Sequence, residues 1–106
     1  MSLAKKRGET EVNVSMPDTI GDGSKDVTTA GTRVQLSSTQ ECRFVNIFAK
    51  AGNTGNIFVG GATVSSSSGM VLEQARSTDW FNIDDLSKVY IDSANDGDGC
   101  QYAYVV

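Results

Sequence analysis

The feature that most constrains the fold of this chain is a regular alternation of short strand-like segments with clusters of turn-forming residues. From about Thr32 onward, segments rich in β-branched and aromatic side chains are divided by turns rich in Ser, Gly, Asn and Asp. One strand roughly every 8–12 residues is typical of all-β sandwiches and barrels. The expected strands are Thr32–Leu36, Cys42–Ala49, Asn56–Val59, Met70–Glu73, Thr78–Ile83, Lys88–Asp92 and Gln101–Val106.

Helical periodicity is weak throughout the chain. The best helical candidate, Val71–Arg76, is too short to be stable without support from neighbouring elements. The length of 106 residues suits a single domain. We therefore predict an all-β fold, in which residues 31–106 form a small β-sandwich or jelly-roll-like body. The pattern leaves the strand order open, so a small barrel stays an alternative.

Residues 1–30 differ in composition from the body. They contain the chain's only proline, Pro17, and few large apolar side chains. We predict that residues 1–30 form an extended N-terminal arm with one short strand, and that the polar residues 18–26 form a loop. The apolar positions that alternate with polar ones in the predicted arm strand are Val12, Val14 and Met16.

Several expected strands carry apolar side chains on both faces. Alternate residues of a strand point to opposite sides, and in Cys42–Ala49 both sides are mainly apolar. Trp80 and Phe81 are adjacent, so a strand there directs one large ring to each side. A two-layer sandwich buries only its inner faces, so the remaining apolar surface needs a cover. We expect a homo-oligomer, with a trimer favoured. The alternative is cover by the arm or a loop of the same chain.

Charge is divided between a basic N-terminal cluster and an acidic body. The chain has 9 basic and 13 acidic residues, a net charge of −4. Lys5, Lys6 and Arg7 supply three of the basic residues, and the 99 residues that follow them carry a net charge of −7. An acidic body argues against a nucleic-acid partner. We interpret the basic cluster as a solvated end. The alternatives are a contact for nucleic acid or for an acidic protein surface.

Side chains suited to catalysis or metal binding are scarce. The chain has no histidine, which removes the commonest general base and the commonest metal ligand. The adjacent carboxylates Asp84 and Asp85 are expected to be solvated. The segment Asp92–Gly97 begins like a calcium loop, but Ala94 and Ala103 stand where oxygen ligands are required. We therefore predict a non-enzymatic protein with no catalytic residues, no cofactor and no metal site.

The cysteines and the apolar segments also limit the class of protein. Cys42 and Cys100 are too few for a disulfide scaffold and lack zinc-site spacing. We expect two reduced thiols and leave a disulfide open as the alternative. No apolar segment follows the basic cluster, and none reaches the roughly 20 residues of a transmembrane helix. We therefore expect neither a secretory signal nor a membrane partner.

Three blocks of sequence resemble, in order and spacing, small structural proteins of tailed bacteriophages. The blocks are Asn53–Gly61 (NTGNIFVGG), Val64–Leu72 (VSSSSGMVL) and Ile83–Asp92 (IDDLSKVYID). The resemblance covers about Arg33–Val106. The chain departs from the family pattern at Glu73–Arg76, where members often have Pro-Gly or Ala-Gly after the leucine.

The resemblance implies a β-sandwich or jelly-roll-like module on a virion that is assembled in the host cytoplasm. The function it favours is capsid decoration (cement), in which the protein stabilises the head by bridging neighbouring subunits of the major capsid protein. An arm strand that pairs with another chain would bridge subunits by β-augmentation. One alternative is a tail, collar, neck or baseplate component. Another is a carbohydrate- or receptor-binding module that uses exposed aromatic rings. The candidate interface residues are Lys5, Lys6, Arg7, Val12, Val14, Met16, Trp80 and Phe81.

Overall fold

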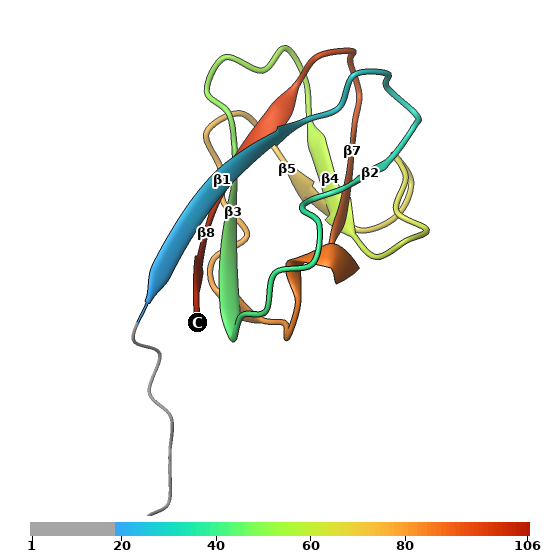
Figure 1. Ribbon diagram of the computed structural model, residues 1–106. Helices are drawn as coiled ribbons and strands as arrows, with labels where there is room; N and C mark the ends of the chain where they lie inside the picture. The colour runs from blue at the N-terminus through green and yellow to red at the C-terminus, as the bar shows by residue number, and fades with distance from the viewer. Residues whose placement is uncertain (1–18) are drawn as a thin grey trace, which may run out of the picture.

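The computed structural model describes residues 19–106, which form two antiparallel four-stranded sheets packed together (Figure 1). Sheet A has the strand order β1-β8-β3-β6, and sheet B has the order β2-β7-β4-β5. A 3-10 turn, η1 (Leu86–Lys88), precedes β7. The strands are β1 Ile20–Asp26, β2 Val34–Gln35, β3 Phe44–Ala49, β4 Ile57–Gly60, β5 Met70–Leu72, β6 Phe81–Asn82, β7 Tyr90–Ser93 and β8 Gly99–Val105.

The strand pairing follows a simple rule. β1 pairs with β8, β2 with β7, β3 with β6 and β4 with β5, always antiparallel. The chain therefore follows the path of one long hairpin that turns back between β4 and β5. The two halves of this hairpin are rolled together and form the two sheets. This is the eight-stranded jelly-roll arrangement. The predicted all-β sandwich is confirmed, and its strand order is that of a jelly roll.

The hydrophobic core lies between the sheets and is built from the inward side of each strand. Val45 and Ile47 of β3 are fully buried, as are Ile57 of β4 and Ile91 of β7. Alternate residues of a strand point to opposite faces, so one face of each strand supplies this core. The core is completed by Val27, Leu36, Cys42, Ala49, Val59, Leu72, Leu86, Val89 and Cys100.

Strand β1 lies where we expected a loop. Its polar sequence shows no apolar alternation, yet all seven residues pair with β8. On its inward side, Gly21 lies opposite Tyr104 and Gly23 lies opposite Tyr102. A Cβ on Gly21 would stand 2.3 Å from the Tyr104 ring, so the ring occupies the space that a side chain on β1 would fill. The loop prediction was wrong because the neighbouring strand supplies the apolar surface of β1.

Two other expected strands differ from those observed. The expected strand Thr78–Ile83 is reduced to β6, because Asp79 has a φ of 60° that interrupts the extended backbone. The expected strand Lys88–Asp92 starts later, because η1 occupies its beginning. The Asp85 carboxylate caps this turn by accepting a hydrogen bond of 2.9 Å from the Ser87 N–H.

Two buried side chains tie the loop before β4 to the beginning of β8. The Asn53 amide donates to the Gly99 carbonyl at 2.8 Å, and the Gly99 N–H donates to Asn53 Oδ1 at 2.9 Å. The Asp98 carboxylate accepts from the N–H groups of Thr54 and Gly55 at 3.0 and 2.9 Å. Because the side chains of Asn53 and Asp98 are both hydrogen-bonded, the loop passes from one sheet to the other without leaving either of these buried side chains unsatisfied.

Replacing Gly99 by alanine should destabilise the protein. A Cβ on Gly99 would lie 2.5 Å from the carbonyl oxygen of Lys25 in β1, so the backbone of the β1–β8 pair must shift. We expect the free energy of unfolding to fall by about 1–3 kcal/mol in urea denaturation. Gly61→Ala is the matched control, since a Cβ there meets nothing within 4 Å. Equal urea midpoints for the two variants would show that the close approach to β1 is unimportant.

Candidate interaction surface

The outward side of β3 is apolar, although this side faces away from the core. Val45, Ile47 and Ala49 point inward and are buried. The alternation therefore places Phe44, Asn46 and Phe48 on the opposite face of sheet A. Of these three, Phe48 is 40% exposed. This arrangement agrees with the expectation that the strand carries apolar side chains on both sides.

Neighbouring strands extend this apolar side across sheet A. The register places Ile20 of β1 opposite Val105 of β8, and Val105 opposite Phe44 of β3. Residues directly opposite one another in a sheet share a face. In the next row Ala103 lies between Asn46 of β3 and Asp22 of β1. In the third row Gln101 lies between Phe48 and Ser24, so polar side chains border the apolar ones. We call this surface the apolar outer face and define it by Ile20, Phe44, Phe48, Ala103 and Val105.

Asn46 lies in the middle of the apolar outer face and has an unsatisfied acceptor. Its side chain is on the outward side of the sheet, yet the residue is only 7% exposed. Its Oδ1 atom is buried and receives no hydrogen bond from the described residues. An unpaired buried polar group costs about 1–3 kcal/mol. Because nearly all buried polar atoms in native proteins find a partner, the face lacks a hydrogen-bond donor at this point.

The structure separates the two aromatic residues that we predicted at an interface. Trp80, just before β6, is 49% exposed, whereas Phe81 is partly buried and packs against the core. Phe81 also lines a small apolar hollow of about 220 Å³ together with Met70 and Ile83. Trp80 is therefore accessible to a partner, and Phe81 serves mainly to close the edge of the sandwich.

The predicted residues of the arm lie outside the described residues. These are Lys5, Lys6, Arg7, Val12, Val14 and Met16. Sequence reasoning also missed Ile20 and Val105, because neither β1 nor its register against β8 was foreseen. Only that pairing shows that these two side chains extend the outward face of β3.

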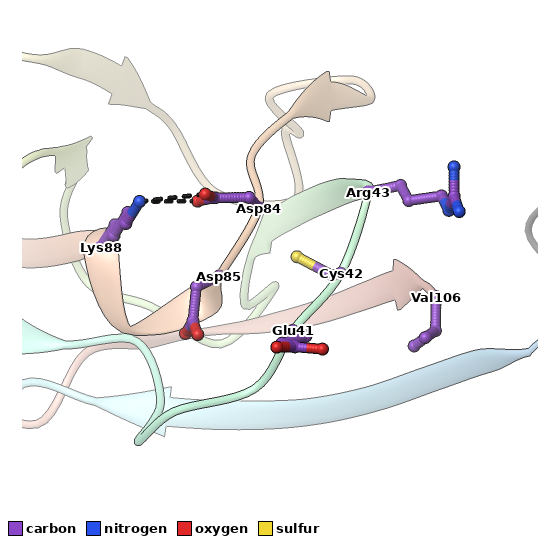
Figure 2. Close-up of a pocket in the computed structure, with 7 residues that line it drawn as sticks. All are labelled: Glu41, Cys42, Arg43, Asp84, Asp85, Lys88 and Val106. Atoms are coloured by element: carbon purple, nitrogen blue, oxygen red, sulfur yellow. Dashed lines mark hydrogen bonds and ion pairs between the residues drawn. The ribbon is translucent and has the colours of Figure 1, made fainter.

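A second feature is an open hollow of about 470 Å³ near the end of β8 (Figure 2). Figure 2 shows Asp84 directed toward Lys88, with which it forms an ion pair of 2.9 Å. Hydrogen bonds from the backbone N–H groups of Ser87 and Gln40 lower the pKa of Asp85. The hollow is lined by Glu41, Cys42, Arg43, Asp84, Asp85, Lys88 and Val106.

The pKa values of two groups in this hollow are shifted in opposite directions. Burial raises the pKa of Cys42, and the charges of Asp85 and Asp84 raise it further, so the thiol keeps its proton. A reactive cysteine needs a lowered pKa, and a carboxyl general acid needs a raised one. The shifts at Cys42 and Asp85 are the opposite of these.

The two cysteines are free and buried. Each stands near the beginning of a strand, so the two would be neighbours if these strands ran parallel. β3 and β8 do pair, but they are antiparallel, and Cys100 lies opposite Ala49 at the far end of β3 from Cys42. Cys42 and Ala49 are seven positions apart, about 23 Å at the usual rise of a strand. The expectation of two reduced thiols agrees with this geometry, which is too long for a disulfide.

Comparison with known proteins gives no relative for this chain: no family model, curated protein or solved structure matches it. Among residues 19–106, no group of three or more cysteine, aspartate or glutamate side chains is placed to hold a metal ion. In the same part of the chain, no helix is long and apolar enough to cross a membrane.

Replacing Asn46 by leucine should stabilise the isolated protein, because it removes the unsatisfied acceptor from an apolar surrounding. We expect the free energy of unfolding to rise by about 1 kcal/mol in urea denaturation. The matched control is Asn53→Leu, since the Asn53 amide makes two buried hydrogen bonds with Gly99. That variant should lose at least about 2 kcal/mol. A loss of similar size in both variants would mean that the isolated protein satisfies Asn46.

The stability of the protein should fall in alkaline solution through Cys100. Burial raises the pKa of this thiol from its ordinary value of 9.0 to about 12. The unfolded chain therefore releases the proton first, and the stabilisation is complete below pH 9 and is lost as the pH rises toward 12. The slope reaches at most about 1.4 kcal/mol per pH unit.

Urea denaturation between about pH 8 and pH 10.5 would measure this slope. Cys100→Ala is the reference variant, because it keeps the lysine and tyrosine titrations and lacks only the buried thiol. It should be less stable at neutral pH but lose less stability on alkalinisation. Parallel curves for the two proteins would contradict the assignment.

Proposed function

We propose that this chain is a non-enzymatic structural protein of a bacteriophage virion, one that decorates the capsid and bridges neighbouring subunits of the major capsid protein. The observation that carries the proposal is the apolar outer face, with the unsatisfied acceptor of Asn46 at its centre. An exposed apolar surface with one buried polar atom suits a protein partner that supplies the missing donor.

Two further arguments support a virion rather than another assembly. The three sequence blocks resemble small structural proteins of tailed bacteriophages. The jelly roll also recurs in viral capsid domains, although a fold alone does not specify a function. No catalytic group has to be invoked, because docking and bridging need only complementary surfaces.

The size of the apolar outer face favours binding at more than one point. The three strands and three rows that contain this face cover on the order of 300 Å², and its five apolar side chains take up only part of that area. A stable complex buries about 800 Å² on each partner, so this face alone would bind weakly. A second contact on the same particle raises the overall affinity through a high effective concentration. In a decoration protein the N-terminal arm, with its basic cluster at Lys5–Arg7, would supply that second contact.

Co-sedimentation with capsids that lack this protein tests the proposed docking face. Phe48→Lys places a charge on the apolar outer face and should weaken binding at least about tenfold, equal to about 1.4 kcal/mol. Val71→Lys is the matched control, because Val71 is 55% exposed on β5 of the other sheet. Both variants should keep the circular dichroism spectrum of the wild type. Equal binding by the two variants would contradict the assignment of the docking face.

The copy number of the chain in purified virions separates the head from the tail. A decoration protein should be present in hundreds of copies, whereas most neck and baseplate components are present in tens or fewer. Quantitative mass spectrometry against the major capsid protein measures the ratio. A low copy number would favour the tail, collar or baseplate alternative over capsid decoration.

A carbohydrate-binding function is the second candidate, and Trp80 is the observation that favours it. Its ring is 49% exposed beside a short edge strand, where it can stack on a sugar. The jelly roll is also found in lectin domains. A glycan array with the isolated protein tests this candidate. It predicts a signal that Trp80→Ala abolishes without unfolding the protein.

A further inference from the structure

Strand β1 presents the longest open edge among the described residues. It has one neighbour, β8, and runs over seven residues. The other three edge strands, β2, β5 and β6, have only two or three residues each. An unpaired edge of this length is a template for an added strand. Figure 1 shows β1 at the outside of the sandwich, alongside β8.

The hydrogen bonds between β1 and β8 show which backbone groups of β1 point to the open edge. The Thr19 carbonyl accepts from the Val106 N–H, and the Val27 N–H donates to the Asp98 carbonyl, both at 2.8 Å. In an antiparallel pair such contacts alternate along the strand. Odd-numbered residues of β1 therefore point their backbone groups toward β8. Even-numbered residues point theirs to the open edge, and these are Ile20, Asp22, Ser24 and Asp26.

The inward side of this edge leaves aromatic surface incompletely covered. Gly21 and Gly23 place no side chain over the rings of Tyr104 and Tyr102, which are partly buried hydrophobic residues against the core. The two rings lie 6.3 Å apart, centre to centre. A strand added beside β1 would bring apolar side chains next to these rings if it alternated apolar and polar residues.

We propose that the open edge of β1 receives residues Val12–Met16 from a second copy of this chain as an added strand. This segment has the required alternation, with Val12, Val14 and Met16 on one side and polar residues between them. The inference goes beyond the proposed function, because it concerns contacts between copies of the chain and holds with or without a capsid.

The sequence beside β1 argues against a tight hairpin within one chain. Thr19 is already bonded to Val106, so only Pro17 and Asp18 remain to connect Met16 to the paired backbone. Hairpin loops of two residues need a positive φ at their first position. Proline has a φ fixed near −65°, so Pro17 is incompatible with such a loop. The donor strand therefore comes more readily from a neighbouring copy.

The length and the charge of the residues before Thr19 also favour a second copy of the chain as the donor. The 18 residues before Thr19 can span about 60 Å when extended, whereas a domain of this size is about 30 Å across. Lys5, Lys6 and Arg7 precede the donor segment, and the 99 residues that follow Arg7 carry a net charge of −7. Attraction between the basic cluster of one copy and the acidic body of the next should assist association and weaken it in high salt.

Two proline variants separate the donor from the acceptor. Val14→Pro combined with Ser15→Pro, the donor variant, removes two consecutive N–H groups from the middle of the donor strand and leaves β1 unchanged. One of these two groups faces β1 whichever way the added strand runs. Ser24→Pro removes an N–H that points to the open edge, a position where a strand tolerates proline. Light scattering should give a discrete oligomer for the full-length wild type. It should give a mass near 11.3 kDa for each variant alone.

Mixing the two variants provides the decisive observation. The donor variant can still accept a strand and Ser24→Pro can still donate one, so a one-to-one mixture should form a species of twice the monomer mass. Hydrogen exchange gives an independent measurement. The Ser24 amide should be protected in the wild-type oligomer and exchange rapidly in the donor variant. The Gly23 amide, which faces β8, should be protected in both.

Three results would overturn the proposal. The first is a wild type that stays monomeric up to about 1 mM, well above ordinary affinities for a stable oligomer. The second is an oligomer that both proline variants retain, which would place the interface elsewhere. The third is a monomer in which Ser24→Pro abolishes capsid binding, which would make a capsid strand the occupant. The capsid proposal is tested separately by the capsid binding of Phe48→Lys, because Phe48 lies on β3 and away from the open edge of β1.

Discussion

The pairing of β1 with β8 is the constraint on which the jelly roll depends. It joins the two ends of the rolled hairpin and makes β8 a central strand, with β1 on one side and β3 on the other. The pairing relies on glycine, because the rings of Tyr104 and Tyr102 occupy the space above Gly21 and Gly23. Aromatic rings that cover cross-strand glycines are a known way to fix the register of a sheet. Gly99 adds to this fit through its close approach to β1.

The same pairing explains what could be predicted from the sequence. Strands such as β3 and β4 carry their own apolar side chains, so their composition predicted them. β1 carries almost none, and only the residues across the sheet show why it is a strand. For the same reason Ile20 was not foreseen in the candidate site. The register that joins it to Val105 and Phe44 depends on contacts between residues far apart in the chain.

The outer faces of the two sheets differ in what covers them. On sheet B, Asp92 is buried and accepts a hydrogen bond of 2.9 Å from the Gly31 N–H, so the loop before β2 lies against this sheet. The Arg33 side chain then donates to the carbonyl of Ala62, which ties this loop to the one after β4. Sheet A instead carries the apolar outer face and the unsatisfied Asn46. The two features on which the proposals rest, this face and the open edge of β1, therefore belong to one sheet.

The order of the strands also has a consequence for the time course of folding. Of the pairs β1–β8, β2–β7, β3–β6 and β4–β5, only the last is joined by a short connection. β1 can pair only after β8, about eighty residues later in the chain, has been made. Folds dominated by such distant pairings form slowly. During synthesis β1 and β3 stay unjoined until β8, which pairs with both, has been made, and β3 leaves apolar side chains uncovered in the meantime. The nascent chain therefore depends on protection from aggregation until its last strand emerges.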